Sequence, residues 1–171
     1  YAGFLSELIF AADRSYMAEG EFEEYNNKEA TIILSNSNFG SFLMSNDMSR
    51  IDTRFIGSPE QILLAKQNLD KQILAEEANN LGLITFMFDD IDWDDEIRMF
   101  LEERSSFSPD SMVGMESNLR FPGKETMETK IFGRLSAWQN WIFQRPSAVG
   151  ENGALKKYGT GNKGQYTKER T

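Results

Sequence analysis

The chain contains neither cysteine nor histidine, and this double absence restricts both its fold and its chemistry. Without cysteine, neither disulfides nor a thiolate-bound zinc can hold the fold together, so the chain must bury a hydrophobic core. Its 171 residues, of which 40% are hydrophobic, are sufficient for such a core. Without histidine, a Ser-His-Asp triad and an HExxH metal site are excluded. Carboxylates, hydroxyls, lysines and backbone N–H groups remain for any catalysis.

The net charge is acidic and unevenly distributed along the chain. A formal charge of -9 at pH 7 argues against nucleic-acid binding, because phosphate neutralisation requires clustered lysine and arginine. From Glu151 onward, five basic and two acidic residues give a local charge of +3. Lys156, Lys157 and Lys163 in this basic tail are candidates for contact with a phosphate-bearing ligand. The alternative is a tail that is simply solvated.

Membrane and secretion signals are not recognisable in the sequence. The longest apolar runs, such as 81–88, fall well short of the roughly 20 residues that a membrane helix needs. The chain begins at Tyr1 rather than at methionine, and no signal peptide is visible. We therefore expect a fragment or processed chain of a soluble, cytoplasmic protein that does not bind membranes.

The first part of the chain mixes helical and strand patterns. Segment 30–34 is rich in β-branched residues, which favour strands. Ser58, Pro59 and Gln61 have the spacing of a helix start with a capping box, and Gly82 is typical of a helix C-cap. We expect a buried helix over 4–12, further helices over 58–69 and 74–81, strands over 13–17, 30–34 and 83–88, and loops over 19–29 and 35–49.

An acidic cluster occupies residues 89–96. It lacks the central glycine and the bidentate glutamate of a calcium loop, so we predict no metal site there. Asp92 is expected instead to cap a helix whose acidic first turn suits the helix dipole. The apolar positions of that helix share one face: Trp93, Ile97, Phe100 and Leu101.

The longest periodic segment runs over 125–144 and predicts a long amphipathic helix. Its apolar positions alternate spacings of four and three: Met127, Ile131, Leu135, Trp138 and Ile142. Pro146 predicts that the helix ends just before it. Ser108 and Pro109 predict the start of a preceding helix. The apolar surface of the long helix is expected to be core or a subunit interface.

Two segments resemble the crotonase, or enoyl-CoA hydratase, superfamily. Segment 2–13, AGFLSELIFAAD, is similar to the glycine-rich turn and buried helix of that superfamily. Segment 74–84, LAEEANNLGLI, is similar to its Ala-x-Glu-Ala helix and the following Gly-Leu-Val. Segment 39–57 occupies the place of its glycine-rich loop and the helix that follows it. The resemblance implies an α/β fold: a partial crotonase-like domain of the ClpP/crotonase spiral type, a C-terminal helical region and an irregular tail.

The second half resembles one branch of that superfamily, the family of benzoyl-CoA-dihydrodiol lyases. The similar segments are 90–96, 103–110, 114–121 and 125–146. The resemblance implies a C-terminal portion of a longer enzyme that hydrolytically opens the ring of 2,3-dihydro-2,3-dihydroxybenzoyl-CoA and releases formate. It further implies a homodimer. It also implies that no cofactor is needed, and CoA counts as part of the substrate. The fragment alone is expected to be inactive without the upstream part of the polypeptide.

The same resemblance divides the chain into three parts. Residues 1–90 are expected to form the C-terminal part of a crotonase-like domain, and residues 91–146 a helical region for packing and oligomerisation. Residues 147–171 are expected to be a tail rich in glycine and lysine. This tail contains a GxGxxG match at 159–164, which lacks the flanking strand and helix of a nucleotide-binding unit and is accidental.

The resemblance also implies the candidate site. Crotonases bind the thioester carbonyl with two backbone N–H groups, and one of them maps to the turn at Gly3 and Phe4. Glu7 matches the first carboxylate of the acid/base pair of the hydratases. Asn36 stands where the second glutamate is expected and cannot transfer a proton as a carboxylate would. Lys156 and Lys157 are candidates for contact with the phosphates of CoA.

Three functions remain open at this point. In the first, the chain belongs to the catalytic body of the lyase, with Gly3 and Glu7 facing the thioester. In the second, it is a degenerate crotonase half that serves as scaffold, dimer interface and wall of the acyl-CoA pocket, which the asparagine at position 36 favours. The third is an ordinary acyl-CoA hydratase or isomerase.

Overall fold

The computed structural model describes residues 1–22, 28–120 and 125–167. The chain divides into two compact units, Tyr1–Met99 and Phe100–Thr171, each of which is described by itself. The three-part division at residues 90 and 146 stays a prediction. The loop expected over 19–29 lies in part outside the described residues.

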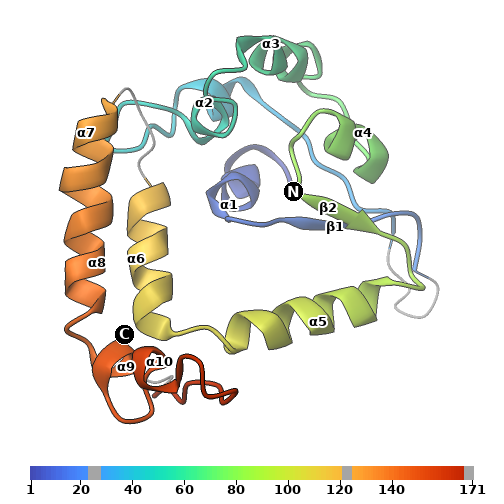
Figure 1. Ribbon diagram of the computed structural model, residues 1–171. Helices are drawn as coiled ribbons and strands as arrows, with labels where there is room; N and C mark the ends of the chain where they lie inside the picture. The colour runs from blue at the N-terminus through green and yellow to red at the C-terminus, as the bar shows by residue number, and fades with distance from the viewer. Residues whose placement is uncertain (23–27, 121–124, 168–171) are drawn as a thin grey trace. The chain divides into compact units, whose positions relative to one another are not determined.

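The first unit joins short helices to a small parallel sheet (Figure 1). Strands β1 (Tyr16–Ala18) and β2 (Phe86–Phe88) pair in parallel, with Met17 opposite Met87. Parallel strands require a long crossover connection, and here the connection contains most of the helices of the unit. The remaining elements of this unit are η1 (Gly3–Leu5), α1 (Ser6–Ala11), η3 (Asn36–Phe39), α2 (Arg50–Arg54), α3 (Pro59–Gln67), α4 (Ala75–Asn80) and the first part of α5 (Trp93–Ser105).

Segment 30–34, which the β-branched residues predicted to be a strand, lies at the centre of this unit. It pairs through isolated bridges rather than a continuous ladder: Ile32 with Ile73, Ile33 with Ala2, and Leu34 with Leu69. Ile32 and Leu34 are 1% and 0% exposed, so alternate residues of the segment point into the core. The other buried apolar residues of this core are Phe10, Met17, Ile51, Phe55, Ala65, Ile73, Ala75, Ala78, Leu81, Leu83 and Ile84.

The helix expected over 4–12 forms as η1 and α1, but it is buried on one face only, so the prediction of a buried helix is correct only in part. The buried residues of α1 are Ser6, Glu7 and Phe10, whereas Phe4 and Leu8 are 65% and 60% exposed. Residues three and four apart share one face of a helix, which here places a carboxylate and a hydroxyl inward. The inward face of α1 is therefore partly polar, and it carries the candidate site.

The predicted start of α3 and the predicted end of α4 are confirmed, but the predicted capping box of α3 is not. Helix α3 begins at Pro59 as predicted, but Ser58 makes no side-chain cap bond, so the predicted capping box is wrong. The backbone of Ser58 alone accepts from the Gln61 N–H. Helix α4 is followed by Gly82 at a φ of +71°, which confirms the predicted C-cap.

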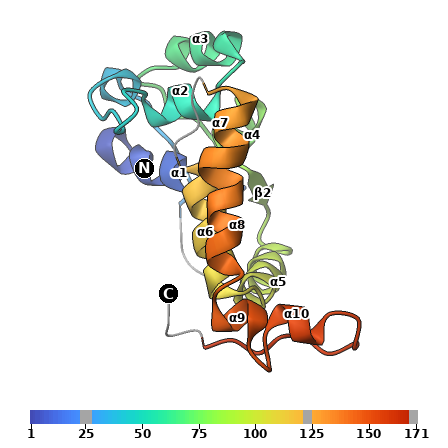
Figure 2. The same ribbon diagram turned by 60° about the vertical axis from the view of Figure 1, so that its left-hand side comes forward.

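The second unit is helical. Helix α6 (Pro109–Leu119) lies beside a continuous helix made of α7 (Met127–Lys130), the π-helical segment η4 (Ile131–Leu135) and α8 (Ser136–Ile142) (Figure 2). The two helices approach closely because α6 has a glycine at the contact: a Cβ at Gly114 would lie 2.8 Å from Cδ1 of Ile142. Arg145 has extended backbone, which confirms the predicted end of the long helix before Pro146.

The tail is more regular than expected. The tail predicted to be irregular contains two short helices, α9 (Pro146–Val149) and α10 (Ala154–Lys157). Pro146 opens α9 because its fixed φ suits the first helical position. In the described part of the chain, no helix is both long and apolar enough to cross a membrane.

Candidate functional site

The site is built on the turn that begins α1. Gly3 has a φ of +51°, a left-handed conformation that glycine adopts without the steric cost of a side chain. Hydrogen bonds attach the turn to the central segment: the Gly3 N–H donates to the Ile33 carbonyl at 3.2 Å, and the Ile33 N–H donates to the Tyr1 carbonyl at 2.9 Å. The turn is therefore held by the core of the first unit.

The Gly3 and Phe4 N–H groups, both candidates for a carbonyl-binding donor, differ in their partners. The Gly3 N–H is already bonded to the Ile33 carbonyl. The Phe4 N–H has no hydrogen-bond acceptor among residues 1–22, 28–120 and 125–167. Of the two, only the Phe4 N–H is available to a ligand.

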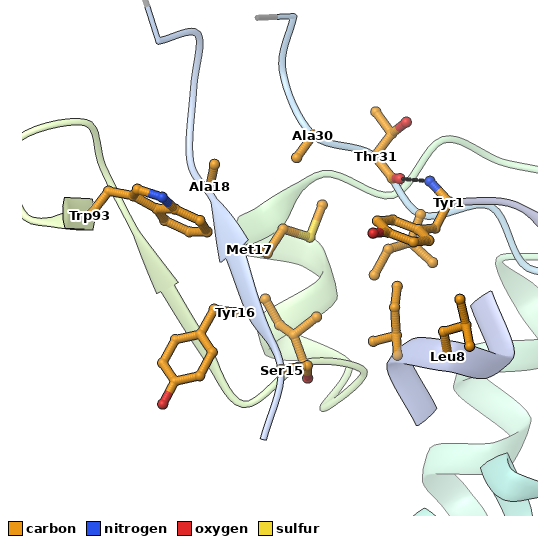
Figure 3. A pocket seen from close by; sticks show the side chains of 12 residues that line it. Tyr1, Leu8, Ser15, Tyr16, Met17, Ala18, Ala30, Thr31 and Trp93 are labelled. Atoms are coloured by element: carbon orange, nitrogen blue, oxygen red, sulfur yellow. Dashed lines mark hydrogen bonds between the residues drawn. The ribbon is translucent and has the colours of Figure 1, made fainter. Parts of the chain in front are cut away.

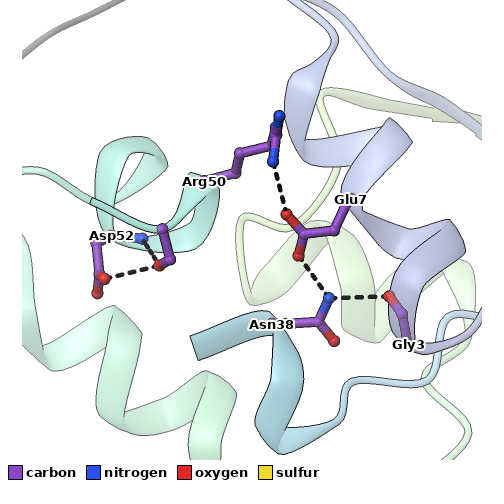
Figure 4. Close-up of polar contacts among 6 residues, drawn as sticks. Gly3, Glu7, Asn38, Arg50 and Asp52 are labelled. Carbon is purple, nitrogen blue, oxygen red and sulfur yellow. Dashed lines mark hydrogen bonds and ion pairs between the residues drawn. The ribbon is translucent and has the colours of Figure 1, made fainter. Parts of the chain in front are cut away.

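Glu7 is buried on the inward face of α1, at 6% exposure, and both of its carboxylate oxygens are bonded. Oε1 accepts from Asn38 Nδ2 at 2.6 Å, and Oε2 forms an ion pair with Arg50 Nη1 at 3.1 Å (Figure 4). The side chain of Arg50 is 31% exposed, so the guanidinium links the buried carboxylate to the surface. A carboxylate buried with a cation and a hydrogen-bond donor is the arrangement that keeps a charge stable inside a protein.

Asn38 connects Glu7 to the turn. It is 1% exposed, and its Nδ2 donates both to Glu7 and to the Gly3 carbonyl, the latter at 2.9 Å. Its Oδ1 accepts from the N–H of Ser35 at 3.0 Å and from the hydroxyl of the same residue at 3.3 Å. The bond from the Ser35 N–H belongs to the capping box of η3, and the two bonds together fix the orientation of the amide.

The structure brings together Gly3, Phe4 and Glu7, three of the residues that the sequence indicated. Asn36 lies on η3 two positions before the residue that contacts Glu7, and its side chain is exposed. Asn38 was not predicted. The Ser35-x-x-Asn38 spacing was the available signal, since a serine followed three residues later by a polar side chain is typical of a capping box.

The basic candidates lie in the second unit. Lys156 and Lys157 form the last turn of α10, with Lys156 exposed and Lys157 half-buried, and Lys163 is exposed in the segment that follows. Cations in the last turn of a helix suit its dipole, so their position has a structural explanation without a ligand.

Arg54 lies on α2, one helical turn after Arg50. Burial lowers the pKa of the Arg54 guanidinium from its ordinary value. Its Nε donates to the Gly82 carbonyl at 2.6 Å, which connects α2 to the end of α4. Arg54 therefore has a structural role, because its hydrogen bond joins two helices of the first unit.

A separate cavity of about 610 Å³ lies between β1 and α1 in the first unit (Figure 3). Leu8 and Ile9 of α1, Tyr16 of β1, and Trp93 at the start of α5 contribute to its lining. Glu7, Asn38 and Phe4 do not line it. Among the described residues, no group of three or more acidic side chains is placed to hold a metal ion.

The arrangement of elements is that of the enoyl-CoA hydratases, the crotonase fold. An enoyl-CoA hydratase of Geobacillus kaustophilus matches 97% of this chain with 57% of its own, at a TM-score of 0.66 and 15% identity. An enoyl-CoA hydratase/isomerase of Mycobacterium paratuberculosis matches the same shares at a TM-score of 0.63 and 12% identity. At this identity, the likeness establishes the fold.

The sequence has a nearer relative. Benzoyl-CoA-dihydrodiol lyase of Aromatoleum evansii is 50% identical over 166 residues, which are 97% of this chain. The chain spans only 29% of the length of that curated protein. No family model matches the chain.

Proposed function

We propose that this chain is a C-terminal portion of a ring-opening lyase that acts on 2,3-dihydro-2,3-dihydroxybenzoyl-CoA and releases formate. The observation that carries the proposal is the 50% identity to benzoyl-CoA-dihydrodiol lyase along 97% of the chain. The proposal includes an upstream part of the same polypeptide, because the chain spans 29% of that relative. CoA is a part of the substrate, and no cofactor is included in the proposal.

In this proposal, the turn at the start of α1 supplies one hydrogen-bond donor to the thioester carbonyl. The unbonded Phe4 N–H supports this role, because a preorganised donor directed at a developing oxyanion is commonly worth about 3–4 kcal/mol. The Gly3 N–H is excluded from it by its bond to Ile33. The second donor of a carbonyl-binding pair is assigned to the upstream part.

Glu7 has a positioning role in this proposal rather than that of a proton donor or acceptor. Both of its oxygens are bonded, and the neighbouring polar side chain is Asn38 rather than a second carboxylate. The competing role is that of a scaffold and pocket wall without any group at the substrate. In the proposed function a group of this chain contacts the thioester, whereas in the scaffold role none does.

The proposed activity is tested on the whole protein that contains this chain. Formate release is measured with 2,3-dihydro-2,3-dihydroxybenzoyl-CoA, and hydration is measured with crotonyl-CoA under the same conditions. The proposal predicts one formate for each ring opened and negligible hydration. Hydration of crotonyl-CoA without formate release from the dihydrodiol would contradict it and favour the acyl-CoA hydratase.

Replacement of Glu7 by glutamine separates positioning from proton transfer. Glutamine keeps an oxygen acceptor for Asn38 but removes the charge that faces Arg50. We expect kcat for ring opening to fall by less than about tenfold, with the shape of its pH profile retained, since general acid–base groups commonly contribute about 100-fold or more. Glu76→Gln, at an exposed position of α4, is the matched control. A loss of about 100-fold with fold and CoA affinity intact would instead make Glu7 the proton-transfer group.

The proposed enzyme is a homodimer, and an exposed apolar stripe of the second unit supports this. The stripe consists of Met127, Ile131, Phe132 and Leu135, whose exposed fractions are 74%, 37%, 73% and 55%. Exposed apolar patches of this kind mark association surfaces, and we assign the stripe to a second copy of the same protein.

Phe132→Asp should therefore convert the dimer to a monomer, because it places a charge in the centre of the stripe. Sedimentation velocity of the whole protein measures the change, and Gln139→Asp, at an exposed position of α8, is the control. A wild-type monomer, or a Phe132→Asp protein that remains dimeric, would contradict the assignment.

A further inference from the structure

The Gly3 carbonyl and the Phe4 N–H belong to the same peptide unit. A trans peptide unit is planar, so its C=O and N–H point in opposite directions and cannot turn independently. The Gly3 carbonyl accepts from Asn38 Nδ2 at 2.9 Å and from the Ser6 N–H. Whatever fixes the direction of that carbonyl also fixes the direction of the Phe4 N–H.

Asn38 is suited to fix this direction because its own amide has no freedom. The side chain is 1% exposed, and its oxygen is held by both the N–H and the hydroxyl of Ser35. The NH₂ group must then face the turn, and its two hydrogens are used by the Gly3 carbonyl and by Glu7. Each donor and acceptor of this buried side chain has a partner.

Glu7 and Arg50 complete the arrangement. The carboxylate accepts from Asn38 at 2.6 Å, and a hydrogen bond to an ionised group is shorter and stronger than one between neutral groups. The other carboxylate oxygen forms an ion pair with Arg50 Nη1 at 3.1 Å, so Glu7 is bonded on both sides. The bonds therefore run from Arg50 through Glu7 and Asn38 to the Gly3 carbonyl.

We propose that Asn38 is a positioning residue that aims the Phe4 N–H at the carbonyl of a CoA thioester. The inference rests on the proposed function, which assigns the Phe4 N–H to that carbonyl. It adds that a side chain 34 positions away in the sequence, on η3, sets the direction of the donor. Asn38 itself does not contact the substrate.

The test uses the whole protein and benzoyl-CoA labelled with ¹³C at its thioester carbonyl, a ligand without the dihydrodiol. Isotope-edited infrared difference spectra report how strongly the bound carbonyl is polarised. In the wild type, the carbonyl band should lie at a lower wavenumber than in free benzoyl-CoA. Asn38→Leu keeps the approximate volume of the side chain and removes both donated hydrogen bonds, so this shift should fall by at least half.

The rate of ring opening should fall together with the carbonyl shift in Asn38→Leu. For ring opening, Asn38→Leu should lower kcat by about tenfold with KM changed less than about threefold, a smaller loss than the roughly 100-fold expected from removal of a donor. A structural role alone would lower the content of folded protein without changing the carbonyl band of the folded fraction. Asn79→Leu, at an exposed position of α4, is the matched control.

The outcomes separate the inference from the proposed function. A wild-type band that does not shift on binding would overturn the proposed role of the Phe4 N–H, and the inference with it. A wild-type shift that is fully retained in folded Asn38→Leu would overturn the inference alone. If circular dichroism shows that Asn38→Leu does not fold, Ser35→Ala takes its place, because it loosens the asparagine amide without removing its two donated bonds. A reduced shift in Ser35→Ala would then support the inference, and an unchanged shift would overturn it.

Discussion

Replacement of Arg145 by alanine should increase hydrogen exchange in α6 and α8 about 100-fold. The Asp110 carboxylate is 1% exposed, and its Oδ1 accepts from Arg145 Nε at 3.1 Å. Its Oδ2 has no hydrogen-bond partner among the described residues, so Arg145 is the cation that compensates this buried charge. The guanidinium also lies 4.7 Å from the centre of the Trp141 ring. Loss of one partner of a buried pair costs about 3 kcal/mol, which corresponds to this factor.

Mass-spectrometric hydrogen exchange on the whole protein measures this effect locally. Arg120→Ala is the control, because it breaks an ion pair with Glu116 in which both side chains are exposed, and such pairs are worth about 0.2–1 kcal/mol. Asp110→Asn in the Arg145→Ala background removes the uncompensated charge and should slow exchange again. If the amide hydrogens of α6 and α8 exchange at the same rate in Arg145→Ala and Arg120→Ala, the buried pair does not stabilise the second unit.

The sequence predicted helix ends well where the signal is local. Ser108 accepts from the Ser111 N–H at 3.4 Å, and Pro109 opens α6 as expected. The residue before Pro146 leaves the helical region because the proline ring clashes with a helical neighbour. These features depend on residues that lie within one turn of each other, so a single sequence is sufficient to predict them.

The candidate site was predictable only in part, because its bonds connect distant segments. Gly3 and Glu7 lie four positions apart, and the resemblance to crotonases indicated both. Asn38 reaches them across 35 and 31 positions, and nothing in the local pattern reports such a contact. The resemblance drew attention to Asn36 instead, whose side chain is exposed.

The orientation of α1 could also not be predicted from the sequence. Apolar residues surround Glu7 in the segment FLSELIF, and composition therefore favoured a helix with buried apolar sides. The structure instead turns Glu7 inward, where Asn38 and Arg50 bond to its carboxylate. Burial of a charged group depends on partners elsewhere in the fold, which helical periodicity does not reveal.

Removal of the Phe4 N–H is expected to have the largest effect on activity. Replacing Phe4 in the whole protein by phenyllactate, its α-hydroxy analogue, turns the peptide N–H into an ester oxygen and retains the side chain. Removal of one donor to a developing oxyanion commonly costs about 100-fold or more. The ester also weakens the Gly3 carbonyl as an acceptor for Asn38, but loss of that bond is expected to cost only about tenfold.

The rate of formate release from 2,3-dihydro-2,3-dihydroxybenzoyl-CoA by this ester variant shows whether the Phe4 N–H donates to the thioester carbonyl. The control is p-hydroxyphenyllactate at Tyr158, which is 88% exposed. We expect kcat to fall about 100-fold or more in the Phe4 variant, with its circular dichroism unchanged, and the Tyr158 variant to keep the wild-type rate. A folded Phe4 variant with kcat within about threefold of the wild type would contradict a donor role at the thioester and leave this unit as scaffold and pocket wall.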